Sequence, residues 1–113
     1  MISIYHNPRC RKSREALAYL KEISIEFKTI EYFKSPLSPN ELKAIIDKLG
    51  IHPAELIRRE ESLWKSQYKD SSLSNQDLIE LMISEPRLMQ RPIVVYGDKA
   101  VIARNLEAIK DLF

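Results

Sequence analysis

The segment that most constrains this chain is the nine-residue stretch from His6 to Arg14, HNPRCRKSR, which joins an apolar, strand-forming start to an amphipathic helix. Residues 1–5 are rich in strand formers, and Pro8 interrupts regular strand pairing shortly after them. From Arg11 to about Ile23, apolar residues recur at helical spacing among charged ones. The chain's single cysteine, Cys10, therefore lies at a predicted junction between a strand and a helix.

Cys10 is surrounded by groups that favour its thiolate. The thiolate is the nucleophile, and a free cysteine with a pKa of ~8.5 is mostly protonated at neutral pH. A helix that begins at about Arg11 supplies the partial positive charge of its unpaired N–H groups. The hydroxyl or N–H of Ser13, and His6 across the loop, are placed to donate hydrogen bonds to sulfur. Positive charge comes from four neighbours, Arg9, Arg11, Lys12 and Arg14. A structural cysteine normally has apolar neighbours, so we expect a reactive one.

The bulk composition is that of an ordinary soluble globular protein. A chain of 113 residues fits one domain, residues 1–113. Its net charge is +2, and its acidic and basic residues are interspersed along the sequence, which gives no case for nucleic-acid binding. No apolar run approaches the about 20 residues that a membrane span needs, and none resembles a secretory signal. One cysteine and two histidines show no spacing typical of a metal site. We therefore expect a cytoplasmic protein that binds no metal, nucleic acid or membrane.

The remaining patterns continue in the order of one α/β domain. A second apolar, β-prone run over residues 27–33 completes a β-α-β start, and Ser38 and Ser74 are good N-cap residues for later helices. The later elements predicted are helices over residues 39–49, 53–57 and 74–86, a β-hairpin with strands 92–96 and 100–103, and a last helix over 106–112. A cysteine after the first strand and a proline before the third are typical of the thioredoxin-like fold. The fold class predicted is α/β, with a mixed four-stranded sheet, flanking helices and a helical insertion between strands two and three.

Four sequence segments indicate a particular family within the thioredoxin-like fold. In the same order along nearly the whole chain, they resemble the glutaredoxin-linked arsenate reductase family. These segments are HNPRCRKSR at 6–14, Leu56-Ile57-Arg58 after a Gly50-Ile51 turn, Arg91-Pro92-Ile93-Val94-Val95, and Ala103-Arg104 before the last helix.

The resemblance implies a nucleophilic cysteine and an oxyanion site made of arginines. Carried over, Cys10 is the catalytic residue, and the substrate-binding residues are Arg58, Arg91 and Arg104. Guanidinium groups suit this role because they make paired, charge-assisted hydrogen bonds to a tetrahedral dianion such as arsenate. Arg58 is followed by Arg59 and two glutamates, a pattern that a surface charge cluster also explains.

Four further residues match supporting positions of the family, and they are His6, Ser13, Arg14 and Pro92. Pro92 follows Arg91 directly before a predicted buried strand, which is a favourable place for a cis peptide bond. Without that context, His6 would be read as a hydrogen-bonded structural residue and Ser13 as a helix cap.

The implied reaction is reduction of arsenate to arsenite through a thiol-arsenate adduct on Cys10. Because the chain has no second cysteine, an outside thiol must resolve the adduct. By resemblance that thiol is glutathione, which acts as co-substrate rather than as a bound cofactor, and glutaredoxin recycles the mixed disulfide.

Three alternatives are considered. Spx-like transcription regulators bind RNA polymerase and typically carry Cys-x-x-Cys here; Ser13 replaces the second cysteine, so such a role would lack the redox switch. A thiol oxidoreductase of this fold acting on another substrate fits the same residues, and the cations Arg11 and Lys12, where reductases commonly have small or neutral residues, leave the substrate open. Phosphatase-like arsenate reductases are disfavoured because they need an arginine where this chain has Ala16.

Overall fold

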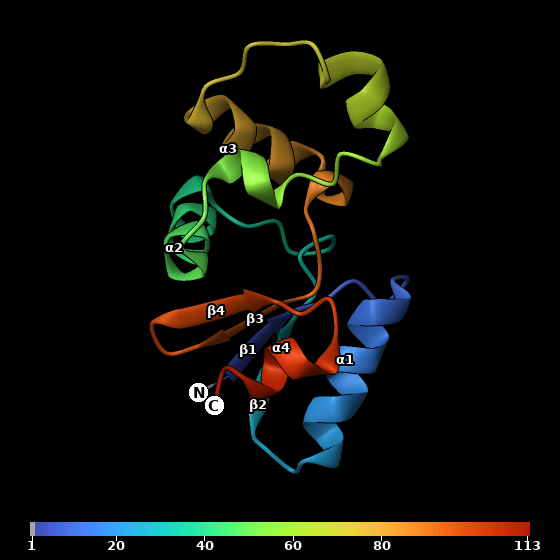
Figure 1. Cartoon of the computed structure of the whole chain (residues 1–113), viewed down its shortest axis with the longest axis vertical. Helices are drawn as coiled ribbons and strands as arrows, with labels where there is room; N and C mark the ends of the chain where they lie inside the picture. Colours follow the sequence, from blue (N-terminus) through green and yellow to red (C-terminus); the bar gives the residue numbers. More distant parts are fainter. Residues whose placement is uncertain (1) are drawn as a thin grey trace. The chain divides into compact units, whose positions relative to one another are not determined.

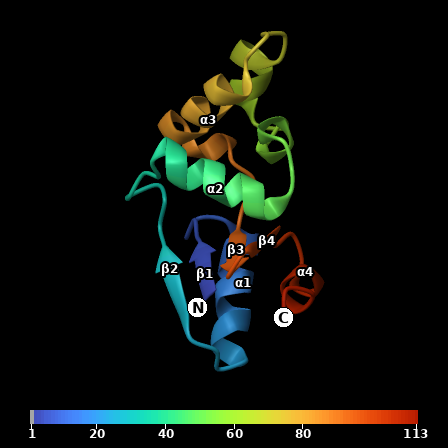
Figure 2. The ribbon, with the colours of Figure 1, turned by 90° about the vertical axis from the view of Figure 1, so that its left-hand side faces the viewer.

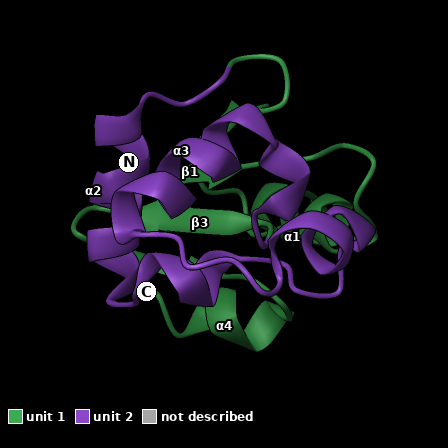
Figure 3. Cartoon of the chain, turned by 90° about the horizontal axis from the view of Figure 1, so that it is seen from above, with its two compact units in different colours: residues 1–35, 91–113 green, residues 36–90 purple. Residues whose placement is uncertain are grey.

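The computed structural model describes residues 2–113; Met1, which the sequence assigns to the first strand, lies outside the described residues. The chain divides into two compact units (Figure 3). Unit 1 comprises Met1–Ser35 and Arg91–Phe113, and unit 2 comprises Pro36–Gln90. The single domain over residues 1–113 stays a prediction.

Unit 1 is built on a mixed four-stranded sheet (Figures 1 and 2). Its strands are β1 (Ile2–Tyr5), β2 (Phe27–Ile30), β3 (Ile93–Tyr96) and β4 (Lys99–Ile102). Their order in the sheet is β2-β1-β3-β4. Strand β1 is parallel to β2 and antiparallel to β3, which in turn is antiparallel to β4. This arrangement confirms the predicted α/β architecture.

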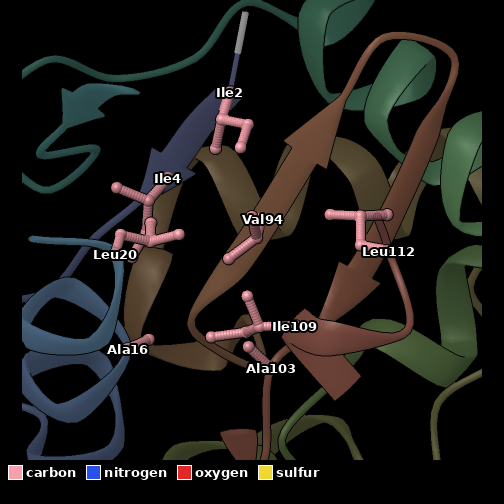
Figure 4. Packing of buried hydrophobic residues seen from close by; sticks show 8 residues of the cluster. All are labelled: Ile2, Ile4, Ala16, Leu20, Val94, Ala103, Ile109 and Leu112. Atoms are coloured by element: carbon pink, nitrogen blue, oxygen red, sulfur yellow. The ribbon is translucent and has the colours of Figure 1, made fainter. Parts of the chain in front are cut away.

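Two helices of unit 1 share a core with one face of this sheet. Helix α1 (Arg11–Glu22) connects the parallel strands β1 and β2, and α4 (Leu106–Lys110) follows β4. Ile4 of β1 is paired with Val94 of β3, and both side chains are fully buried in this core. Figure 4 shows the cluster, whose members are Ile2, Ile4, Ala16, Leu20, Val94, Ala103, Ile109 and Leu112. The helical spacing of Ala16 and Leu20 puts both on the buried face of α1, as predicted.

Unit 2 is the helical insertion between β2 and β3. Its elements are α2 (Pro39–Leu49), η1 (Pro53–Leu56), η2 (Trp64–Tyr68), α3 (Asn75–Ser84) and η3 (Pro86–Leu88). Both longer helices begin where the sequence predicts, because Ser38 and Ser74 each close a capping box with the acidic residue three positions later. Helix α2 ends at Gly50, whose φ of 68° lies in the left-handed region that glycine adopts most readily.

The structure differs from the sequence prediction in several details, among them the ends of β2, α3 and α4 and the unpredicted segments η2 and η3. Strand β2 ends at Ile30 instead of residue 33, because the next residues form a turn in which the N–H groups of Lys34 and Ser35 donate to the carbonyl of Glu31. Helix α4 ends at Lys110, two residues before the predicted end. The π-helical segment η2 was not predicted, since its residues lack a regular apolar period.

The buried position of Ile109 predicts a large loss of stability on truncation. Ile109 is fully buried in the core of unit 1, whereas Leu106 on the same helix is 40% exposed. Ile109→Ala is expected to lower the free energy of unfolding by about 2–5 kcal/mol, because it removes buried methylene groups and leaves a cavity. Leu106→Ala is the matched control and is expected to cost less than about 1 kcal/mol. Urea unfolding followed by circular dichroism measures both, and equal losses would contradict this packing.

Candidate functional site

Cys10 holds the N-cap position of α1, at the junction predicted from the sequence. Its backbone is extended, with φ −91° and ψ 124°, and its carbonyl accepts the first helical hydrogen bond from Arg14 N–H at 3.0 Å. The thiol is free and half-buried. The sulfur is therefore close to the unpaired N–H groups of the first helical turn, which carry partial positive charge.

Asn7 organises the loop between β1 and Cys10. Its carbonyl accepts a hydrogen bond from Cys10 N–H at 3.0 Å, and its side-chain oxygen accepts one from Arg9 N–H at 3.1 Å. Its own N–H donates to the hydroxyl oxygen of Ser13 at 3.0 Å. These three bonds fix the turn that carries the cysteine, so Asn7 has a larger part in the site than the sequence indicated.

The buried hydroxyl of Ser13 ties the loop to the helix. Its Oγ lies 2.6 Å from Nδ1 of His6, and it also accepts the N–H of Asn7. Because that oxygen already accepts the amide proton, its own proton is available to donate to Nδ1 of a neutral imidazole. The sequence left open whether the hydroxyl or the N–H of Ser13 serves the sulfur. The structure assigns the hydroxyl to His6 and Asn7 and the N–H to Cys10.

The pKa of the Cys10 thiol lies below its ordinary value because hydrogen bonds and one charge outweigh the effect of burial. Burial of the sulfur is the largest single influence and raises the pKa. It is opposed by the backbone N–H of Ser13, by a hydrogen bond from the Arg91 side chain together with its charge, and by the backbone N–H of Lys12. The sulfur makes no cap hydrogen bond of standard geometry within α1, so the two N–H groups act on it as nearby donors. The sum favours the thiolate.

Arg91 reaches this site through the sheet. Tyr5 at the end of β1 is paired with Ile93 at the start of antiparallel β3, so the segments that follow β1 and precede β3 lie at the same end of the sheet. The Arg91-Pro92 peptide bond is cis, as predicted, and the carbonyl of Pro92 accepts a hydrogen bond from Ala103 N–H at 2.8 Å.

The cations that neighbour Cys10 in sequence act differently from what was expected. The side chain of Arg11 is 84% exposed and pairs with Glu15 at 3.1 Å. That of Arg14 donates from Nη1 to the carbonyl of Pro8 at 2.9 Å, which braces the loop. The charges of these neighbours are not among the largest influences on the pKa of Cys10, whereas the charge of the distant Arg91 is.

The other two predicted substrate-binding arginines lie in different surroundings. Arg104 belongs to unit 1, is exposed between β4 and α4, and its N–H donates to the carbonyl of Ile102 at 2.9 Å. Arg58 belongs to unit 2, where its guanidinium pairs with Glu60 and Glu61, each at 3.3 Å. Their roles toward a substrate stay predictions.

Neither a metal cluster nor a membrane-spanning helix occurs in the described part of the chain. Residues 2–113 contain no group of three or more histidine, cysteine, aspartate or glutamate side chains able to hold a metal ion. Over the same range, no helix is long and apolar enough to cross a membrane.

The Arg91 contact predicts how the reactivity of Cys10 depends on pH. Alkylation by iodoacetamide is expected to titrate with an apparent pKa below that of free cysteine, because the structure favours the thiolate. Arg91→Ala should raise this pKa, since it removes both a hydrogen bond and a charge. Arg11→Ala, which removes an exposed cation paired with Glu15, should leave it nearly unchanged. A wild-type value at or above that of free cysteine would refute the thiolate argument.

The environment of His6 predicts a loss of stability in acid. Burial lowers the pKa of His6 by more than the nearby Glu31 carboxylate raises it. A lowered pKa in the folded state means that the unfolded state binds the proton more readily, so stability is present above the ordinary value of 6.5 and is lost as the pH falls through the folded-state pKa. Urea unfolding at pH 7.5 and 5.5 measures the free energy of unfolding at each pH. Its decrease between the two should be smaller for His6→Gln than for the wild type. The variant of the exposed histidine, His52→Gln, is the control and should behave as the wild type.

Comparison with known proteins identifies the family. The model of the ArsC family matches residues 5–112. The uncharacterized protein YfgD of Escherichia coli K12 is 43% identical over 113 residues, which cover 98% of this chain and 95% of that protein. An arsenate reductase of Neisseria meningitidis is 40% identical over 111 residues, 96% of this chain and 95% of the relative. The global transcriptional regulator Spx of Enterococcus faecalis is 32% identical over 111 residues, 97% of this chain and 84% of the regulator.

A comparison with a solved structure supports the same family assignment and tests the predicted fold. The arsenate reductase from Vibrio cholerae is 37% identical and matches with a TM-score of 0.93, covering 99% of this chain and 97% of that one. This match confirms the predicted fold class. Since the family model and these relatives span nearly the whole chain, the protein belongs to the ArsC family.

Proposed function

We propose that this protein is a thiol-dependent oxidoreductase that reduces arsenate to arsenite, with Cys10 as the nucleophile. The observation that carries the proposal is the Cys10 thiol at the N-terminus of α1, with its pKa lowered by Ser13, Arg91 and Lys12. A thiolate of this kind is poised for attack, and the adjacent guanidinium is a group that binds oxyanions. The similarity to an arsenate reductase of Neisseria meningitidis supports arsenate as the substrate.

In the proposed first step, the Cys10 thiolate attacks arsenic and forms a sulfur–arsenic bond. One arsenic–oxygen bond breaks, and the oxygen leaves as hydroxide, which becomes water on taking up a proton. Arsenic stays pentavalent in this step. Arg91 hydrogen-bonds the thiolate before attack, and we propose that the same guanidinium, together with Arg104 and Arg58, neutralises the arsenate dianion.

The second step needs a thiol from outside, because Ser13 stands where a second cysteine would form an internal disulfide. We propose glutathione as this co-substrate. Its thiolate attacks the sulfur of Cys10, a disulfide forms, the sulfur–arsenic bond breaks, and its electron pair reduces arsenic to the trivalent arsenite. Glutaredoxin then attacks the glutathione sulfur and releases the Cys10 thiolate, a good leaving group because its pKa is low. We propose the cytoplasm as the location, where glutathione keeps thiols reduced.

In this proposal each supporting residue has a positioning role, and the geometry of unit 1 supports these roles. Ser13 and His6 hold the loop through their hydrogen bond, and Arg14 fixes it through the carbonyl of Pro8. Pro92 follows Arg91 in a cis peptide bond at the end of the sheet that carries Cys10. None of these four residues is proposed to touch arsenate.

The second candidate function is transcriptional regulation, which the 32% identity to the regulator Spx of Enterococcus faecalis supports. Such a role would require binding to RNA polymerase without a disulfide switch, because the chain has one cysteine. A thiol oxidoreductase that acts on another substrate is the third. If the protein binds purified RNA polymerase and the Cys10→Ser variant still binds it, the regulatory role is favoured. If the protein removes glutathione from glutathionylated proteins but does not reduce arsenate, the oxidoreductase with another substrate is favoured.

The arsenate assignment predicts activity that depends on Cys10 and Arg91. Purified protein with arsenate, glutathione and glutaredoxin should oxidise NADPH through glutathione reductase, and Cys10→Ser should abolish this activity. Arg91→Ala should lower kcat/KM about 10–100-fold, because it removes a charged hydrogen bond at the reacting sulfur. Arg58→Ala should lower it about tenfold if that guanidinium binds the oxyanion.

Two controls make the assay decisive. Arg87→Ala changes another arginine of unit 2, half-exposed and paired with Glu85 at 3.5 Å, and should leave kcat/KM within about twofold of the wild type. Each assay must include an active arsenate reductase as a positive control, which shows that the coupling through glutaredoxin and glutathione reductase works. An inactive wild type under those conditions would overturn arsenate as the substrate.

A further inference from the structure

Unit 2 contains a basic pocket beside the π-helical segment η2, the yellow-green helical turn of Figure 1. Its volume is about 430 Å³, and it is lined by Arg59, Trp64, Lys65 and Lys69. Pockets that hold small molecules commonly measure about 300–1,000 Å³. Apart from Arg58, no residue of unit 2 has a role in the proposed arsenate chemistry.

The wide turn of η2 brings Trp64 and Lys69, which are five residues apart, to the same pocket. The N–H of Lys69 donates to the carbonyl of Trp64 at 2.9 Å, a hydrogen bond between residues five apart. It brings Lys69 back toward the turn that carries Trp64 and Lys65. Such π-type turns are rare and occur frequently at functional sites.

The indole ring of Trp64 is held in place from within η2. Its ring and that of Tyr68 are stacked, with centroids 6.2 Å apart and planes inclined by 26°. Trp64 is half-buried, so part of its surface faces the pocket while Tyr68 supports it. A fixed and partly exposed indole is a surface on which a flat ring can stack.

The cations of the pocket have no carboxylate partner in the described part of the chain. Glu60 and Glu61, which follow Arg59 in sequence, both pair with Arg58, and Asp70, which follows Lys69, forms no ion pair with it among the residues that the structure describes. Within residues 2–113, none of Arg59, Lys65 and Lys69 forms an ion pair. Three positive charges therefore converge on one pocket beside an aromatic ring.

We propose that this pocket binds a small anion that carries a flat ring and two or more negative charges, the chemical class of nucleoside phosphates. The ring would stack on Trp64, and the phosphate oxygens would accept charge-assisted hydrogen bonds from Arg59, Lys65 and Lys69. An inorganic anion would leave the indole unused, and an uncharged ring would leave three cations without partners. The pocket belongs to unit 2 and Cys10 to unit 1, and the proposal does not depend on the proposed reductase activity.

Trp64 gives a direct readout, because it is the only tryptophan of the chain. The probes are ATP, tripolyphosphate and adenosine, titrated into the full-length protein while indole fluorescence is recorded. ATP should quench the fluorescence with a Kd at least about tenfold lower than either partial probe, since it alone combines stacking with charge. Tripolyphosphate that binds as tightly as ATP would overturn the role of the ring. ATP binding seen by calorimetry without a change in fluorescence would overturn the location.

Matched variants separate the pocket from general surface charge. Lys69→Gln should weaken ATP binding at least about threefold, and Trp64→Leu should weaken it about tenfold by calorimetry. Lys43→Gln, at an exposed lysine of α2 in the same unit, should leave the affinity unchanged, and circular dichroism checks that each variant is folded. Equal weakening by Lys43→Gln and Lys69→Gln would overturn the proposal. Cys10→Ser should bind ATP as the wild type does, whether or not arsenate reduction is observed.

Discussion

The antiparallel pairing of β1 with β3 is the constraint on which the candidate site depends. It places the start of β3 against the end of β1, with Tyr5 opposite Ile93 and Ile4 opposite Val94. A slip of one residue would turn the buried Ile4 away from the core, so the hydrophobic pattern fixes the register. That register carries Arg91 to the Cys10 loop and lets residues far apart in sequence act on one sulfur.

Competing influences set the protonation of Cys10, and the loop decides their balance. Burial of the sulfur opposes ionisation, and the loop offsets this cost by placing donors around it. Asn7 receives hydrogen bonds from Cys10 and Arg9 and donates to the hydroxyl of Ser13. Ser13 thus has two tasks, because its hydroxyl holds the loop and its N–H serves the sulfur. The rigidity of the loop and the stability of the thiolate have the same structural origin.

Local signals in the sequence predicted most of the fold but only part of the site. The capping boxes at Ser38 and Ser74 and the left-handed Gly50 mark helix ends through short-range hydrogen bonds, so they could be read directly. The segment η2 could not, because its residues have no regular period. The influence of the cations near Cys10 was misjudged for a related reason. Proximity in sequence does not show that the side chain of Arg11 is exposed and pairs with Glu15.

The sequence by itself determined the junction of strand and helix at Cys10, the order of the strands and α-helices, and the presence of a single cysteine, because each follows from neighbouring residues or from a simple count. Only the tertiary structure decided which charge acts on the sulfur, which atom of Ser13 serves it, and that three cations gather around Trp64. These features depend on strand register, side-chain direction and a wide helical turn. The contact between Arg91 and Cys10 arises from packing between residues far apart in the chain, whereas the other two features arise from local backbone geometry that the residue pattern does not specify.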